Sequence, residues 1–263
     1  MVYSQAKSYA ISGVIMKLKL IACEVLARPV YLCASRSPHI IDIDLIKKGL
    51  HERPAELRAH LQSRVDSAED QAYDYILLGY GLCGQATAGL VARTVPLVIP
   101  RAHDCITLFL GSRLLYQHQF DNHPGTYWYA QDYIERSDGS TSVLSLGSGT
   151  DNLLQATYEE YVQKYGKDNA DYLMEVMGAW QQHYQRAVYI DMGVGDGTLV
   201  QQQAQEGAAR RGWTFERLTG DLVLIRRLLE GDWQAGDDFL TIPPGHAIQM
   251  TYDESILACL PQP

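Results

Sequence analysis

The sequence predicts an α/β protein with a parallel-sheet, Rossmann-like architecture. Along most of the chain, short apolar runs alternate with segments in which apolar residues recur at helical spacing, which is the pattern of β-α-β units. Glycine-rich turns follow two of the apolar runs and lead into the next segment, as in many folds of this class. With 46% hydrophobic and 20% charged residues, the 263-residue chain has the composition of an ordinary globular protein.

In the first part of the chain, strands are expected where the apolar runs are short and bounded by polar residues. They cover residues 17–24, 40–46, 73–80 and 95–100. The run "IIDIDLI" alternates apolar and acidic residues, which is typical of a half-exposed strand. Helices are expected at residues 51–69, with Pro54 in the first turn, at 85–93 and at 105–120.

The α/β alternation weakens after residue 120 and resumes near residue 187. Between these points we expect a polar surface loop and two helices that meet at Gly166. Further strands are expected at 187–191, 213–218 and within 238–253, and further helices at 197–212 and 221–231. The chain therefore reads as two α/β halves joined by an aromatic and helical segment.

The domain organisation follows from these changes in pattern. We expect a loose N-terminal extension at 1–16, a first α/β half at 17–135, a polar loop at 136–156, and a second half, helical and α/β, at 157–263. The extension carries one lysine and no strong apolar core, unlike a signal peptide. No apolar run reaches the roughly 20 residues of a membrane-spanning helix, so a cytoplasmic protein without membrane contact is expected. The net charge of −9 argues against nucleic-acid binding, which needs clustered Lys and Arg.

The five cysteines do not resemble a disulfide framework, because their number is odd and their spacing is wide. Three of them, Cys23, Cys83 and Cys105, each follow an expected parallel strand. The carboxyl ends of parallel strands meet at one edge of the sheet, where ligands bind in open α/β folds. These thiols are therefore expected to converge, whereas Cys33 and Cys259 are read as structural.

His103 and Cys105 form an H-x-C pair whose side chains would share one side of an extended segment. Thiolate and imidazole suit Zn²⁺, our first choice of cofactor. Three thiolates also suit a [4Fe–4S] cluster with one open iron. The spacing is not a compact zinc pattern, so a site without metal stays open as the third alternative.

Residues beside the cysteines are candidates for catalysis and cofactor binding. Gly81 and Gly84 in "GYGLCG" let the backbone turn tightly and present Cys83 at the sheet edge. Arg101 could pair with a carboxylate or phosphate of a ligand, and His51 lies in another loop that follows a strand. Asp104 could orient His103, although capping the following helix is the simpler role.

A second glycine motif, "DMGVGDGT" (residues 191–198), follows an expected strand and opens a helix. It resembles the nucleotide-binding turn of many S-adenosylmethionine-dependent methyltransferases, with Gly193 and Gly195 as candidate cofactor-binding positions and Glu216 after the next strand. Too little chain follows it for the rest of that fold, and Thr198 replaces the third glycine of a dinucleotide motif. A nucleotide or adenosyl cofactor is therefore not expected, and a plain turn capped by Asp196 is favoured.

Several longer phrases occur together: "IACEVL", "LGYGLCG", "VPLVIPRAHDCITLFLGS", "PGTYWY", "YGKDNADYLMEV", "GDLVLIRRLLEGDW" and "FLTIPPGH". Over about residues 17–257 they resemble the bacterial and archaeal family catalogued as domain of unknown function 1638. Members of that family are often encoded near corrinoid-dependent methyltransferases and their reactivation proteins, which implies a role in one-carbon or methyl-group metabolism. Zinc-type corrinoid methyltransferases use an H-x-C pair and a distant cysteine, but here the other cysteines precede His103 and no barrel pattern is present.

Together these observations predict a cytosolic metalloenzyme that acts on a small molecule, as a transferase or a lyase. Its metal would be held by Cys23, Cys83, Cys105 and His103 and would activate a thiol or another soft atom. The alternative is a non-catalytic accessory protein that binds a corrinoid, a metal, a corrinoid protein or a methyltransferase. A third interpretation is a metal-free pocket with a reactive Cys83 or Cys105. The sequence leaves a homo-oligomer open.

Overall fold

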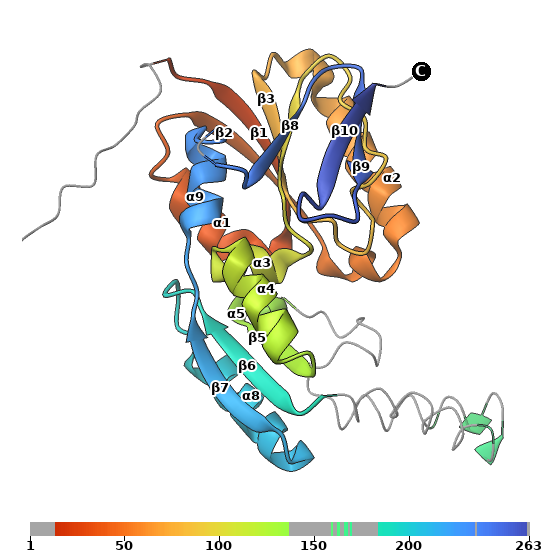
Figure 1. Ribbon diagram of the computed structural model, residues 1–263, viewed down its shortest axis with the longest axis vertical. Helices are drawn as coiled ribbons and strands as arrows, with labels where there is room; N and C mark the ends of the chain where they lie inside the picture. Colours follow the sequence, from red (N-terminus) through yellow and green to blue (C-terminus); the bar gives the residue numbers. More distant parts are fainter. Residues whose placement is uncertain are drawn as a thin grey trace, which may run out of the picture.

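The computed structural model describes residues 14–136, 159, 162–163, 166–167, 169, 184–234 and 236–261. In this part of the chain the strands form a five-stranded sheet in the order β2-β1-β3-β4-β8, a three-stranded sheet in the order β5-β6-β7, and the hairpin β9-β10 (Figure 1). The fold is thus mixed α/β with mostly parallel sheets, which confirms the predicted class. Most of the expected N-terminal extension, polar loop and helices around Gly166 lies outside the described residues.

The strands and helices have the following bounds. The strands are β1 (Lys17–Cys23), β2 (Ile40–Ile46), β3 (Tyr75–Gly79), β4 (Leu97–Pro100), β5 (Thr126–Ala130), β6 (Arg186–Asp191), β7 (Thr214–Thr219), β8 (Phe239–Ile242), β9 (His246–Met250) and β10 (Leu257–Pro261). The α-helices are α1 (Ala27–Ala34), α2 (Pro54–Ala68), α3 (Cys105–Leu110), α4 (Arg113–Asn122), α5 (Gln131–Glu135), α8 (Thr198–Arg211) and α9 (Val223–Glu230). Short 3₁₀ turns are η1 (Glu24–Leu26), η2 (Lys48–Glu52) and η3 (Glu69–Gln71).

The large sheet is parallel from β2 to β4 and ends in the antiparallel strand β8. The inner strands β3 and β4 are apolar along their length because helices cover both faces of the sheet. The edge strand β2 is half exposed, as its alternating sequence predicts. The order β2-β1-β3 means that the chain moves to opposite sides of β1 in successive connections. The carboxyl ends of β1 and β3 therefore flank a topological switch point, the usual ligand-binding position in such sheets.

Two hydrophobic cores lie against the large sheet. The core on the α2 side joins Leu57 and Leu61 of α2 to Ile76 and Leu78 of β3. The second core contains the opposite side chains of the strands, helices α1 and α9, and residues of β6 such as Val188. In Figure 1 the small sheet lies below the large one, with α3 and α4 between them. The second core thus joins the two sheets.

The prediction of a helix at residues 85–93 is wrong, since this segment contains turns and an isolated bridge rather than a helix. Cys83, Gly84 and Gln85 have left-handed backbone with φ of 47°, 63° and 71°, which a right-handed helix cannot continue. Further along, Gly89 and Ala92 donate their N–H groups to the carbonyls of Ile248 and His246 at 2.7 and 2.9 Å. The segment therefore forms short turns and bonds to the C-terminal hairpin instead of forming a continuous helix.

The single helix expected at residues 105–120 is two helices. Gly111 ends α3 with a φ of 67°, and the Ser112 side chain accepts a hydrogen bond from Leu115 N–H at 3.1 Å to begin α4. Strand β5 arises in the region where the sequence signal is weak. Helices α8 and α9 end at Gly212 and Gly231 as expected, both in the left-handed conformation.

None of the helices in the described ranges is long and apolar enough to cross a membrane.

Candidate functional site

The carboxyl edge of the large sheet carries the three thiols that the sequence singles out. Cys23 is the last residue of β1, and the pairing of Ala22 with Gly79 places it level with Tyr80, the residue after β3. Cys83 lies in the loop that follows, and Cys105 is the first residue of α3. We call Cys23, Cys83 and Cys105 the thiol cluster.

Two loops run closely side by side and carry Cys83 towards the start of α3. Leu82 and Cys83 donate their N–H groups to the carbonyls of Ala102 and His103, both at 2.8 Å. A Cβ atom added at Gly81 would lie 2.6 Å from the Ala102 oxygen, closer than any real side chain could stand. Gly81 is thus required for the contact between the loops. The Gly84 φ of 63° likewise favours glycine.

The backbone at Cys83 is strained. Its φ of 47° is unusual for a residue with a side chain and typically costs about 1–3 kcal/mol. Glycine would adopt this conformation without that cost. A cysteine that stays in such a position is a candidate for function, because sparsely populated backbone conformations cluster at active and binding sites.

The three thiols share one electrostatic environment. Burial raises the pKa of Cys23 to about 11 and that of Cys83 to about 12, and it raises the pKa of Cys105 well above its ordinary value. Charge on Cys23 raises the pKa of Cys83 further, and charges on both raise that of Cys105. The residues expose part of their surface, yet enough protein surrounds each sulfur for desolvation to be the largest influence. The free thiols are therefore protonated near neutral pH.

The thiol cluster lies across the edge of the sheet rather than on one face. Cys83 packs against the core on the α2 side, Cys105 against the other core, and Cys23 against both. Within the described ranges, no three His, Cys, Asp or Glu side chains stand as a group that could hold a metal ion. The structure thus brings the thiols to one edge of the sheet, but among the described residues they do not form a metal-binding group.

Tyr80 is the residue at this edge that sequence reasoning missed. Its side chain is only 3% exposed, and its hydroxyl has no hydrogen-bond partner among the described residues. Burial raises the Tyr80 pKa far above its ordinary value, and charge on Cys23 and Cys83 raises it further. The available signal was the aromatic residue in "LGYGLCG", but the missing partner is a property of packing.

His103 and Asp104 lie beside the cluster in different settings. His103 is exposed, and its ring stacks on Tyr116 with centroids 5.7 Å apart. The Asp104 carboxylate accepts hydrogen bonds from Ile106 N–H at 2.9 Å and from the Tyr116 hydroxyl at 3.1 Å. Asp104 therefore caps α3, and burial raises its pKa. Its charge also acts on Cys83 and Cys105.

Arg101 and His51, the other candidate catalytic residues, contact the backbone elsewhere. The Arg101 guanidinium donates to the carbonyls of Ser255, at 2.9 Å, and Leu257, and it lies 3.1 Å from the Asp237 carboxylate. It thereby fastens the C-terminal segment to the large sheet. His51 Nδ1 lies against the Lys48 carbonyl within η2.

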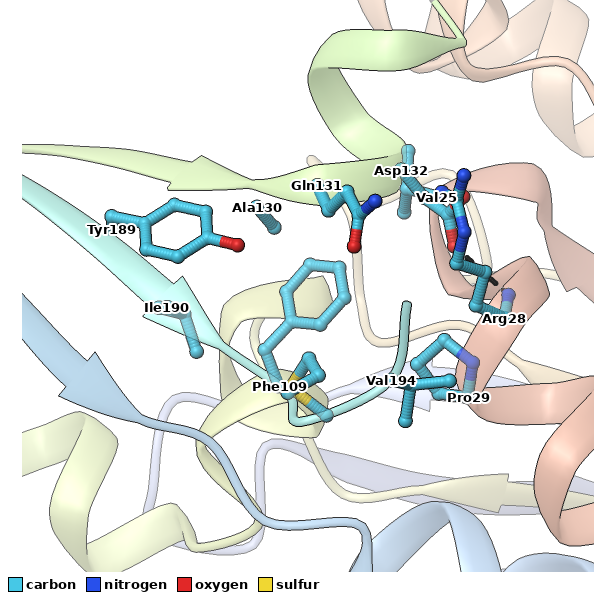
Figure 2. A pocket seen from close by; sticks show the side chains of 11 residues that line it. Val25, Arg28, Pro29, Phe109, Ala130, Gln131, Asp132, Tyr189, Ile190 and Val194 are labelled. Atoms are coloured by element: carbon cyan, nitrogen blue, oxygen red, sulfur yellow. Dashed lines mark hydrogen bonds and ion pairs between the residues drawn. The ribbon is translucent and has the colours of Figure 1, made fainter. Parts of the chain in front are cut away.

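The second glycine turn, residues 191–198, borders a small recess at the carboxyl ends of β5 and β6. Figure 2 shows Arg28, Gln131 and Val194 around it, from three different segments. The volume open to the centre of a water molecule is about 10 Å³, which is room for one water. A Cβ atom at Gly195 would lie 3.1 Å from Arg28 Nε, whereas one at Gly193 would meet nothing within 4 Å.

Polar groups of this second turn are bonded within the protein. Gly197 is the N-cap residue of α8 and offers no side-chain cap. Asp196, the expected cap, lies one residue earlier and accepts a hydrogen bond from Thr198 N–H, the first residue of the helix, at 3.1 Å. Glu216, the candidate ribose ligand, lies within β7 rather than after it and forms an ion pair with Arg186 at 2.5 Å. The Arg28 side chain pairs with Asp132 and Glu135. The glycines here shape a turn whose two carboxylates already accept hydrogen bonds from the protein.

Comparison with known proteins gives a family without an assigned activity. A family model described as "protein of unknown function (DUF1638)" matches residues 45–229. This region includes Cys83 and Cys105 and begins after Cys23. No protein with a curated description and no solved structure matches the chain. The chain belongs to the DUF1638 family.

Proposed function

We propose that the thiol cluster binds a thiophilic metal ion, and that the protein is a metal-dependent enzyme of small-molecule metabolism, acting on methyl groups or thiols. The observation that carries this proposal is that three thiols follow three neighbouring strands at the switch point of a parallel sheet and lie near enough for the charge of one to raise the pKa of another. The strained backbone at Cys83 supports it, since the chain keeps a thiol where glycine would fit better.

Burial of the thiols favours a metal over a reactive cysteine. A nucleophilic cysteine needs a lowered pKa, usually from a nearby cation or a helix N-terminus. Here desolvation raises the pKa of Cys23 and Cys83 to about 11 and 12, so neither is a thiolate at neutral pH. A metal ion replaces the protons and compensates the thiolate charges where water does not.

The donor set suits either of the two expected cofactors. Three thiolates with an open fourth position match zinc as well as the open iron of a [4Fe–4S] cluster. When bound, such a metal would supply a Lewis acid that lowers the pKa of a substrate thiol. The protein's own part is to hold the sulfurs: Cys23 packs against both cores, one of which it shares with Cys83 and the other with Cys105.

The proposal is tested by the metal content and absorption spectrum of the full chain, purified without oxygen. Zinc is colourless, whereas an iron–sulfur cluster absorbs visible light through thiolate-to-iron charge transfer. One zinc ion or one cluster per chain is the expected result. A protein that holds neither after purification, and takes up neither when they are supplied, contradicts the proposal.

The accessory role is a second candidate because α4 presents an exposed aromatic surface next to the site. The rings of His103, Tyr116 and Phe120 stack in sequence, with centroids 5.7 and 6.3 Å apart. Phe120 is 58% exposed and Leu114, on the same helix, is 83% exposed. A corrinoid protein or a methyltransferase is the partner that the family resemblance implies. Turnover of a small thiol by the purified chain favours the enzyme, whereas binding to such a partner without turnover favours the accessory role.

A further inference from the structure

Tyr80 carries a buried hydroxyl that the fold does not satisfy. The residue is 3% exposed, and its Oη atom has no hydrogen-bond partner in the described part of the chain. Most other buried unpaired atoms belong to side chains that bond through a second atom, as Arg58 does through Nη2 to the Gln85 carbonyl. A tyrosine has one polar atom, so it has no such second contact. Buried polar groups in native proteins are nearly always bonded, and an exception calls for an explanation.

The position of Tyr80 ties this hydroxyl to the thiol cluster. The β1–β3 register pairs Ala22 with Gly79, so the next residues along the two strands are Cys23 and Tyr80. Tyr80 belongs to the core on the α2 side, and Cys23 and Cys83 both pack against that core. Charge on either thiol also acts on the Tyr80 hydroxyl. The unpaired donor and two of the proposed metal ligands thus occupy the same place at the sheet edge.

We propose that Tyr80 is a ligand-binding residue whose hydroxyl donates a hydrogen bond to the small molecule held at the thiol cluster. This inference rests on the proposed function and adds to it the chemistry of the ligand. The molecule must present an acceptor atom, a thiolate sulfur or an oxygen, next to the atom that the metal binds. A thioether or an alkyl group without such an acceptor would leave the hydroxyl unpaired and lose the contact.

The alternative is that the hydroxyl only fills space. In that case removing it would not affect binding, and phenylalanine would serve as well. Sites built to hydrogen-bond a ligand discriminate strongly against ligands that lack the group, because the buried partner is then left unsatisfied. The two explanations therefore predict different affinities of the Tyr80→Phe variant for the ligand.

A pair of matched variants tests whether the hydroxyl is unpaired in the free protein. Tyr73 is similarly buried, at 7% exposed, but its hydroxyl donates to Asp42 Oδ2 at 2.7 Å. The melting temperature of metal-free Tyr80→Phe should equal or exceed that of the wild type, whereas Tyr73→Phe should melt lower. Equal destabilisation by both substitutions would mean that the Tyr80 hydroxyl is already bonded, and would overturn the proposal.

The binding experiment uses cobalt(II) in place of zinc and 2-mercaptoethanol as the probe. Cobalt absorbance reports the metal, and its change on titration reports the probe. Cobalt should bind equally to the wild type and to Tyr80→Phe, while the probe should bind the variant about 10-fold more weakly, since the hydrogen bond from the Tyr80 hydroxyl to the probe's oxygen is lost. Equal probe affinity with intact cobalt binding overturns the role of Tyr80 alone. Absence of cobalt binding in the wild type overturns the metal site, and the role of Tyr80 with it.

Discussion

Each sheet has a glycine-containing turn at the carboxyl end of a parallel strand, after β3 in the large sheet and after β6 in the small one. The two turns differ in whether their polar groups have hydrogen-bond partners. In the turn after β6, Asp191 accepts a hydrogen bond from Gly193 N–H at 2.9 Å. Asp196 accepts hydrogen bonds from the Thr198 hydroxyl at 2.6 Å and from Thr198 N–H at 3.1 Å. These contacts hold the pKa of both carboxyls below the usual range. The turn therefore needs no ligand to complete it.

The turn after β3, by contrast, contains a strained residue and lies next to a hydroxyl without a hydrogen-bond partner. Cys83 keeps a left-handed backbone with a φ of 47°, and the Tyr80 hydroxyl has no partner within the described ranges. Burial and mutual charge raise the pKa values of the neighbouring thiols. A glycine motif alone does not distinguish a structural turn from a binding site. Strain and unsatisfied groups do, because a ligand can relieve them.

The largest expected effect concerns the turn after β3, where the affinity for metal should depend strongly on pH. Cys23 and Cys83, with pKa values of about 11 and 12, hold their protons at neutral pH, so a metal must displace them. Affinity therefore rises with pH, by up to roughly a thousandfold per unit if three protons leave. Competition titrations with cobalt at several pH values measure this slope. An affinity that does not change with pH would contradict ligation by these thiols.

Replacing a glycine by alanine should destabilise the protein more in the turn after β3 than in the turn after β6. Gly81→Ala places a Cβ atom 2.6 Å from the Ala102 carbonyl oxygen, so we expect a loss of about 1–3 kcal/mol of unfolding free energy from overpacking. Gly193→Ala meets no neighbour and loses only about 1 kcal/mol through its φ of 64°. Urea denaturation of both variants measures the difference. Gly81→Ala should also weaken metal binding, whereas Gly193→Ala should leave it unchanged.

Two substitutions at Cys83 should distinguish the effect of backbone strain on stability from the effect of the thiol on metal binding. Both remove the thiol, but only glycine relieves the positive φ of 47°. Cys83→Gly should therefore be more stable than Cys83→Ala by about 1 kcal/mol, and both should lose the metal. If the glycine variant is the less stable of the two in urea denaturation, the backbone at Cys83 is not strained.

The smallest expected effect is at the start of α8. Asp196→Ala removes the hydrogen bond from Thr198 N–H and should lower the melting temperature slightly. Metal content should not change, since the structure places this carboxylate in the other turn. A loss of metal in this variant would show that the two turns are coupled.

The sequence predicts best those features that depend on neighbours along the chain. The strands β1 to β4 appear as short apolar runs, and Gly212 and Gly231 end their helices because glycine adopts the left-handed conformation. The placement of three cysteines after three strands is local in the same sense. Their position at one edge of the sheet then follows from parallel topology, whereas their convergence on one ion stays a prediction.

Features that depend on distant partners escaped prediction. Residues 85–93 have a helical composition but give N–H groups to the C-terminal hairpin. Gly111 breaks the expected helix where a Cβ atom would lie 2.6 Å from that of Asp221. The unpaired hydroxyl of Tyr80 and the separation of Cys83 and Cys105 between two cores are results of packing. The spacing of residues along the sequence does not predict these two features.

The most direct test of the thiol cluster compares metal content across four forms of the full chain. Wild type and Cys33→Ala, whose cysteine lies in a core away from this edge, should each hold one metal ion or cluster. Cys83→Ala and Cys105→Ala should lose it, because each removes one of three thiolate ligands. Folding of all four forms is checked by circular dichroism. Equal metal content in the four proteins, or none in the wild type after supply of zinc or reconstitution of a cluster, would contradict the account.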